Sequence, residues 1–179
     1  NHYNDENYIN TLKKQKYLKN KTDRKLLLQD LDCQKKSQKL MIDFICNYAK
    51  KLKNLNIVIR VHPSENPKIY NDLAKKFKNV FCDNSFSVHP WILVSNKMLN
   101  HYCTTTIEGL TANKKVISIK PYYNSKIEIN DFFEITNVAK NEDEIFKEIN
   151  SSKKNNFKRV KYFAYNALGK TDSISKIVE

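Results

Sequence analysis

The sequence predicts an α/β fold in which a parallel sheet is flanked by helices. Short segments rich in β-branched residues alternate with longer segments whose apolar residues recur every three or four positions. Each connection between two strands is long enough to hold a helix, which is the arrangement of parallel βαβ units. The chain has 179 residues and is 40% hydrophobic. We therefore expect a packed core rather than a disordered chain.

The expected elements follow one another from about residue 34. Strands are predicted at 57–61, 79–82, 98–103 and 115–119, with a less regular fifth candidate at 132–135. Helices are predicted at 34–55, after Pro67, at 88–95, at 107–112, at 142–149, at 157–168 and at 173–178. Residues 1–22 are polar and charged, and Leu26–Leu28 form a short apolar patch. We interpret 1–30 as a linker or interdomain arm and 31–179 as one domain.

The charge balance favours anionic partners. The net charge is +13, from 32 Lys and Arg against 19 Asp and Glu, but only three of the basic residues are Arg. A basic surface attracts nucleotides, phosphates or an anionic membrane. Proteins that read nucleic acids usually use Arg for bidentate contacts, so we expect no specific nucleic-acid partner. A non-catalytic module that binds RNA or another polyanion remains the alternative from a different class.

The cysteine pattern argues against a metal-binding protein, and the apolar runs argue against a membrane-spanning one. The four cysteines form no CxxC pair and have no His at zinc-ligand spacing, so no metal is expected and they are interpreted as small core residues. No apolar run approaches the roughly 18 residues that cross a bilayer. A cytoplasmic protein, with peripheral contact at the inner face of the membrane, fits these observations.

Polar residues follow the predicted strands at their carboxyl ends. They are His62-Pro63, Asp83–Ser85, Thr104–Thr106 and Lys120–Tyr122. Ligands of parallel α/β sheets bind beyond these ends, so the four segments are expected to line one edge. Neither GxGxxG nor GxxxxGK[ST] occurs, so no dinucleotide or P-loop motif applies.

Each candidate residue also has a structural interpretation. Thr105 and Glu108 have the spacing of a capping box, whereas three hydroxyls beside the first amides of a helix also suit a phosphate. His62 is either a phosphate ligand or a turn residue before proline. His89 is attributed to a helix start, and His101 to the inside of a strand. Arg60 is expected to pair with a buried acid.

Four segments, taken in order, resemble the bacterial surface-carbohydrate biosynthesis proteins. The segments are Ile59–Asn66, Ser87–Ile92, His101–Glu108 and Lys115–Pro121. The first contains R-x-H-P-S-E and the third C-T-T-x-I-E. These proteins are similar to glycosyltransferases of the GT-B architecture, which has two Rossmann-like domains. The resemblance covers about 40–125 and implies a Rossmann-like, nucleotide-sugar-binding domain, the C-terminal half of such an enzyme.

The resemblance also implies roles for individual residues. His62, next to Pro63, would contact the donor phosphate and stabilise its departure. Thr104, Thr105 and Thr106 would hold phosphate, and Glu108 would bind the ribose hydroxyls. Thr106 departs from the family pattern, in which a small residue, often Gly, is common at this position. The larger side chain is expected to narrow the phosphate-binding turn. A GT-B enzyme also needs a second domain for the acceptor, so the chain is expected to be the donor half of a longer enzyme.

The expected reaction is transfer of a sugar from a nucleotide-activated donor in surface polysaccharide synthesis. The partners would be a nucleotide sugar and a saccharide or lipid-linked saccharide acceptor. No cofactor is expected, because the nucleotide sugar is the substrate, and the reaction is expected to be independent of metal. A nucleotide-sugar epimerase shares the architecture and stays an alternative.

Overall fold

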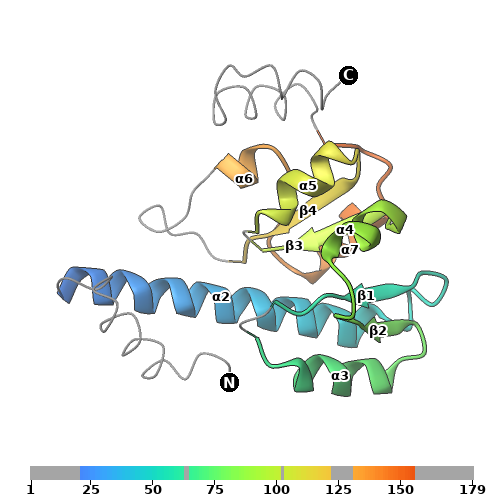
Figure 1. The fold of residues 1–179 in the computed structure, drawn as a ribbon, viewed down its shortest axis with the longest axis horizontal. Helices are drawn as coiled ribbons and strands as arrows, with labels where there is room; N and C mark the ends of the chain where they lie inside the picture. Colours follow the sequence, from blue (N-terminus) through green and yellow to red (C-terminus); the bar gives the residue numbers. More distant parts are fainter. Residues whose placement is uncertain (1–20, 63–64, 102, 122–130, 156–179) are drawn as a thin grey trace. The chain divides into compact units, whose positions relative to one another are not determined.

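The computed structural model describes residues 21–62, 65–101, 103–121 and 131–155. It is an α/β structure with two small parallel sheets flanked by helices (Figure 1). The chain divides into two compact units, which we call unit 1, ending at Phe86, and unit 2, beginning at Ser87. The parallel pairing predicted from the sequence is confirmed, but the strands form two sheets instead of the single one expected.

Unit 1 contains a two-stranded sheet and two described helices. Its elements are α2 (Lys21–Tyr48), β1 (Ile57–Ile59), α3 (Pro67–Lys76) and β2 (Val80–Cys82). In the parallel register Ile59 lies opposite Cys82. Both strands follow the prediction but are shorter: β1 ends two residues early, at Ile59, and β2 begins one residue late, at Val80.

Helix α2 begins well before the predicted helix. The boundary expected at residue 30 falls inside it, and residues 21–30 form its first turns. Leu31, Phe44 and Ile45 on α2 are buried, while most residues of its first turns are exposed or half-buried. A helix whose first turns carry polar side chains into solvent has the composition of a linker, which is why polarity alone misplaced the boundary. Residues 1–20 of the expected arm lie outside the described residues.

Helix α3 begins as its sequence predicts. The side chain of Asn66 accepts a hydrogen bond from the Lys68 amide at 2.9 Å, and Pro67 occupies the first helical position. Proline has no amide hydrogen, and the first turn of a helix needs none there. The His62–Asn66 segment therefore ends in a firmly capped helix.

Unit 2 contains a three-stranded sheet in the order β3-β4-β5. Its elements are α4 (Val88–Val94), β3 (Lys97–Asn100), α5 (Thr105–Thr111), β4 (Lys115–Ile119), α6 (Asp131–Glu134), β5 (Asn137–Ala139) and α7 (Glu142–Asn150). The fifth strand predicted at 132–135 is wrong: that segment falls mainly in α6, and β5 follows it. The helices predicted at 157–168 and 173–178 lie outside the described residues.

Strand β4 is covered on both faces. All five of its residues are buried. Val116 faces α5, because a Cβ added to Gly109 of that helix would lie 2.9 Å from its Cγ2. Lys115 donates from Nζ to the Glu148 carbonyl of α7. Successive strand residues point to opposite faces, so α5 and α7 lie on opposite sides of the sheet.

Gly109 allows helix α5 to approach the sheet closely. An added Cβ would lie only 2.4 Å from the Met98 sulfur, inside the usual contact distance. The helix ends at Thr111, and two residues later Asn113, with a positive φ of 55° and an amide bonded to the Leu110 carbonyl, turns the chain back toward β4. The buried cluster beneath α5 consists of Leu110, Val116 and Ile135.

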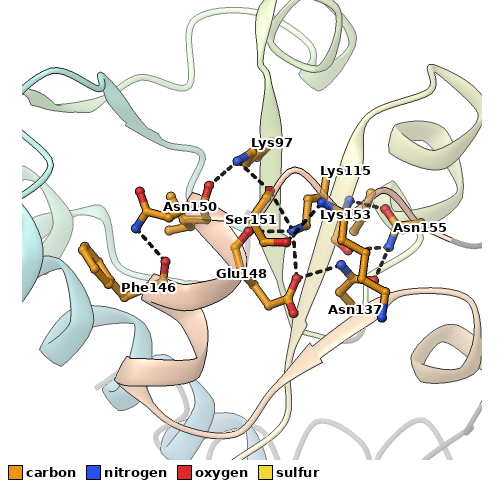
Figure 2. A network of polar contacts seen from close by, with 11 residues as sticks. Lys97, Lys115, Asn137, Phe146, Glu148, Asn150, Ser151, Lys153 and Asn155 are labelled. Atoms are coloured by element: carbon orange, nitrogen blue, oxygen red, sulfur yellow. Dashed lines mark hydrogen bonds and ion pairs between the residues drawn. The ribbon is translucent and has the colours of Figure 1, made fainter.

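Two lysines stabilise the carboxyl end of α7 (Figure 2). Lys97 and Lys115 begin β3 and β4 and are register partners. Lys97 Nζ donates to the carbonyls of Ile149 and Ser151, and Lys115 Nζ to those of Glu148 and Ser151. The last carbonyls of a helix lack intrahelical donors and carry the negative end of its dipole, so cations there are favourable.

Two asparagine side chains act in place of strand residues. Asn155 accepts from the Val116 amide at 2.7 Å and donates to the Val116 carbonyl at 2.9 Å. Asn84 makes the same pair of bonds with Val61, at 3.0 and 3.1 Å. A side-chain amide carries one acceptor and one donor group, as a peptide unit does. Each asparagine therefore completes the hydrogen bonding of a residue whose neighbouring strand does not reach it.

The cysteines follow the prediction only in part. None of the four forms a disulfide: Cys33 is buried, Cys82 and Cys103 are half-buried, and Cys46 is exposed. The interpretation of Cys46 as a core residue was wrong, because this residue lies on the exposed side of α2. Among the described residues, no helix is long and apolar enough to cross a membrane.

Candidate functional site

The carboxyl end of β1 presents the exposed side chain of His62. Two residues earlier, Arg60 donates to the backbone carbonyls of Asp83 and Phe86. Arg60 was expected to pair with a buried acid, but it instead holds the loop after β2 through these carbonyls. The arginine of the R-x-H-P-S-E segment therefore ties the two exit loops of unit 1 together.

The exit loop of β2 is ordered by its own polar side chains. The Asp83 carboxylate accepts from the Ser85 amide at 2.7 Å and from the Ser85 hydroxyl. These two bonds, with a smaller contribution from the charge of Arg60, lower the pKa of Asp83. The loop is thus negatively charged next to the segment that carries His62.

Hydrogen bonds hold the backbone around His62 on both sides. Asn84 bonds both the amide and the carbonyl of Val61. The Glu65 carboxylate accepts from the His62 amide at 3.3 Å, and the Glu65 amide donates to the His62 carbonyl at 2.8 Å. The imidazole of His62 is therefore an exposed group on a fixed backbone. Pro63, the other predicted residue here, lies outside the described residues.

In unit 2, the turn after β3 uses one of its three threonines as a buried structural group. Thr106 is fully buried, and its hydroxyl accepts from Asn100 Nδ2 at 2.9 Å. Thr104 is exposed and Thr105 is half-buried. Thr106 was expected to face a ligand, but it faces the strand instead. Thr104 and Thr105 keep positions from which their hydroxyls can reach solvent.

The capping box predicted at Thr105 and Glu108 is not formed. Helix α5 begins at Thr105, so Thr104 is the N-cap, and its side chain makes no capping bond. Thr104 has helical φ and ψ, which differ from the extended backbone of a side-chain N-cap. A related arrangement occurs at α7, where Asn141 accepts from the Glu144 amide and Glu144 accepts from the Lys140 amide.

Glu108 meets a histidine that the sequence analysis had set aside. His89 Nε2 of α4 lies 3.5 Å from Glu108 Oε2. That oxygen is buried and has no hydrogen-bond partner in the described residues. The His89 side chain is 69% exposed, so the contact is open to water and contributes little on its own. The carboxylate therefore retains an acceptor atom that a donor can use.

His101 lies at a strand end that the sequence analysis did not assign to it, next to the expected strand-end residue Lys120. β3 ends at Asn100, so His101 is not inside the strand but directly after it. Lys120 follows β4, the neighbouring strand, in the same way. Burial, and then the positive charge of Lys120, lower the pKa of His101 to about 4. The imidazole is consequently neutral at pH 7 and able to accept a hydrogen bond.

Among the described residues, no group of three His, Cys, Asp or Glu side chains is arranged to hold a metal ion.

Lys120 Nζ also lies 4.1 Å from the centre of the Phe133 ring, a cation–π contact. The polar groups at the strand ends of both units thus include imidazole, hydroxyl, ammonium and carboxylate groups. These groups can bind phosphate and sugar hydroxyls.

Comparisons of the chain with protein-family models, with curated proteins and with solved structures found no match.

Proposed function

We propose that the chain is the donor-binding domain of a glycosyltransferase with the GT-B architecture, acting in bacterial surface polysaccharide synthesis. The observation that carries the proposal is the setting of His62. Its side chain is exposed at the carboxyl end of a parallel strand, and the backbone amides and carbonyls of Val61 and His62 are all hydrogen-bonded. Ligands of parallel α/β sheets bind at such strand ends. A hydrogen-bond donor held in a fixed position stabilises the negative charge that develops on a departing phosphate.

In the proposed reaction a sugar hydroxyl of the acceptor attacks the anomeric carbon of the nucleotide sugar. The bond from that carbon to the phosphate oxygen breaks, and the nucleoside phosphate leaves with the electron pair. His62 donates a hydrogen bond to the phosphate and stabilises its charge. A general base takes the proton from the acceptor hydroxyl, and none of the described residues is assigned to that role.

Unit 2, considered by itself, also carries groups that we propose for nucleotide binding. Thr104 and Thr105 supply hydroxyls to phosphate, whereas Thr106 supports the turn through Asn100. Glu108 accepts from ribose hydroxyls, and its buried oxygen without a hydrogen-bond partner favours this role. The proposal requires no metal, because protein donors stabilise the leaving phosphate.

Thermal unfolding with added nucleotide tests this proposal. At physiological salt, CMP, UMP, UDP and GDP are added in turn to the full chain. At least one is expected to raise the Tm, since a ligand that binds only the folded state stabilises it. His62→Ala and Glu108→Ala are expected to lose this rise, while Asn71→Ala, at an exposed position of α3, retains it. Salt-sensitive RNA binding with no nucleotide effect would support the polyanion-binding module instead.

A further inference from the structure

The carboxylate of Glu65 is held by two side chains from other elements of unit 1. Tyr70 of α3 donates from its hydroxyl to Glu65 Oε1 at 2.9 Å, and Gln38 of α2 donates from Nε2 to the same oxygen at 3.0 Å. Gln38 Nε2 also donates to the Tyr70 hydroxyl at 2.8 Å. These three side chains therefore form a closed triangle of hydrogen bonds. We call Gln38, Glu65 and Tyr70 the carboxylate triangle.

The triangle leaves one carboxylate oxygen for His62. Glu65 Oε2 accepts from the His62 amide, while Oε1 takes the two bonds of the triangle. Tyr70 is 7% exposed, so its hydroxyl has little access to water. Burial, reinforced by the charge of Glu65, raises the pKa of Tyr70, and the phenol remains a donor across the physiological range. The bond pattern therefore has a fixed direction.

This arrangement determines where the His62 imidazole lies. An exposed side chain on a loop between a strand and a helix would ordinarily move with that loop. Here Asn84 fixes Val61 from one side and Glu65 fixes both backbone groups of His62 from the other. The Cα–Cβ bond of His62 therefore has a set direction, although the ring itself is in solvent.

We propose that Glu65 is a positioning residue for His62, held in place by Tyr70 and Gln38, and that it fixes the histidine for contact with the phosphate of a nucleotide donor. This inference rests on the proposed function. It gives a physical role to the final glutamate of the R-x-H-P-S-E segment, which makes no contact with donor. A preorganised group loses less freedom on binding, so the carboxylate raises affinity by acting on the free protein.

Glu65→Gln is the sharpest test, because it keeps the shape of the side chain. A glutamine has one acceptor oxygen, so its NH2 group must face either the His62 amide or the donors of the triangle. With the NH2 group facing His62, the bond from the His62 amide is lost; with it facing the triangle, the Tyr70 hydroxyl and the Gln38 amide must both turn round to accept from it. Affinity for the stabilising nucleotide, among CMP, UMP, UDP and GDP, is measured by titration calorimetry on the full chain. Glu65→Gln is expected to weaken binding about tenfold, similar to the loss of partners that orient metal-binding histidines.

A double-mutant cycle separates positioning from general destabilisation. His62→Ala and Glu65→Gln are combined, and the double variant is expected to bind no more weakly than His62→Ala alone. Tyr70→Phe is expected to weaken binding in the same direction as Glu65→Gln. Asn155→Ala is the matched control: it removes an equivalent pair of amide bonds in unit 2, at the amino end of β4, and should leave affinity unchanged.

Backbone relaxation by NMR provides a readout that needs no nucleotide. The order parameter of the His62 amide is expected to fall in Glu65→Gln from a rigid value of about 0.85 toward 0.6, and to stay unchanged in Asn155→Ala. If His62→Ala loses nucleotide affinity while Glu65→Gln retains it, or if the two losses add, the positioning role is wrong and the proposed function stands. If His62→Ala binds every nucleotide as the wild type does, both are wrong.

Discussion

His101 shows how the position of one residue sets its chemistry. Its imidazole lies directly after β3, is partly shielded from water and is near the ammonium of Lys120. Both effects disfavour the charged form, and burial is the larger. An uncharged imidazole at the end of a parallel strand can accept a hydrogen bond from a sugar hydroxyl or share a proton with it.

Acid stability is expected to depend on His101. The unfolded histidine binds a proton as the pH falls through about 6.5, whereas the folded one binds it only near pH 4. The unfolded state therefore holds more protons between these values, and the free energy of unfolding falls by up to about 1.4 kcal/mol per pH unit before levelling off. His101→Gln should flatten this part of the curve in urea unfolding measured from pH 4 to 7.

His62→Gln is the control for that experiment, because His62 is exposed. An NMR titration of the His101 ring gives an independent reading, with an expected midpoint near pH 4. A midpoint near 6.5, together with an unchanged slope in His101→Gln, would contradict the expectation.

Single residues were predicted from the sequence where local rules determine them. Pro67 begins α3 as expected, because the preference of proline for the first helical position is a local rule. The role of Thr106 was wrong, since its hydroxyl bonds with Asn100 across the turn, and this depends on where β3 stops. His101 was missed for the same reason: an apolar run reaching Cys103 made the strand look longer than it is.

At the scale of elements, the lysines at the start of β3 and β4 join the sheet to α7. Lys115 is 6% exposed and lies 2.8 Å from the Glu148 carboxylate, which also accepts from Asn137 at 2.7 Å. Partial burial opposes ionisation of Glu148, but the bonds from Lys115 and Asn137 and nearby positive charges outweigh it, so its pKa is lowered. Burial and the charge of Lys115 lower the pKa of Lys97. The carbonyl and carboxylate oxygens to which the two lysines donate offset the repulsion between their positive charges.

Lys115→Met is expected to destabilise unit 2 by about 2–4 kcal/mol, because it leaves the partly buried Glu148 carboxylate and the Glu148 carbonyl without their cation. Lys97→Met should cost less, since Lys97 bonds only carbonyls. The measurement is urea unfolding at pH 7, followed by circular dichroism. Lys147→Met, at an exposed position of the same helix, serves as the control and should change stability by less than about 0.5 kcal/mol. Equal stability of the Lys115 and Lys147 variants would refute this role.

Elements were predicted best where their composition was extreme. β4, a run of β-branched residues between lysine and proline, was placed as the structure has it. The segment at 132–135 was not, because a short apolar run suits a strand and a helical turn equally. The capping box failed because its spacing also occurs where the helix begins one residue earlier than the motif implies.

At the scale of the whole molecule, the excess of lysine acts over longer distances than any single contact. The net charge of +13 is distributed along the chain, and lysine is a well-hydrated point charge. Such a charge attracts anionic surfaces without selecting a particular arrangement of groups. This fits peripheral contact with an anionic membrane as part of the proposed function.

Binding to phosphatidylglycerol vesicles is expected at about 50 mM salt and should be largely lost at about 500 mM, where charges are screened within a few ångströms. Sedimentation of the full chain with the vesicles measures it. Vesicles of phosphatidylcholine alone are the control and should bind little at either concentration. Salt-independent binding to both kinds of vesicle would show that apolar contact, not charge, holds the protein at the surface.

The two asparagine side chains that complete the sheets also make the fold sensitive to slow chemical ageing. Hydrolysis of either amide to a carboxylate exchanges an NH2 donor for a second acceptor, which would then face the carbonyl oxygen of Val61 or Val116. A change of one mass unit would thus replace an attraction with a repulsion at the end of a strand. For Asn84 that strand end carries His62, so the age of a protein sample would affect the proposed site before it affected the core.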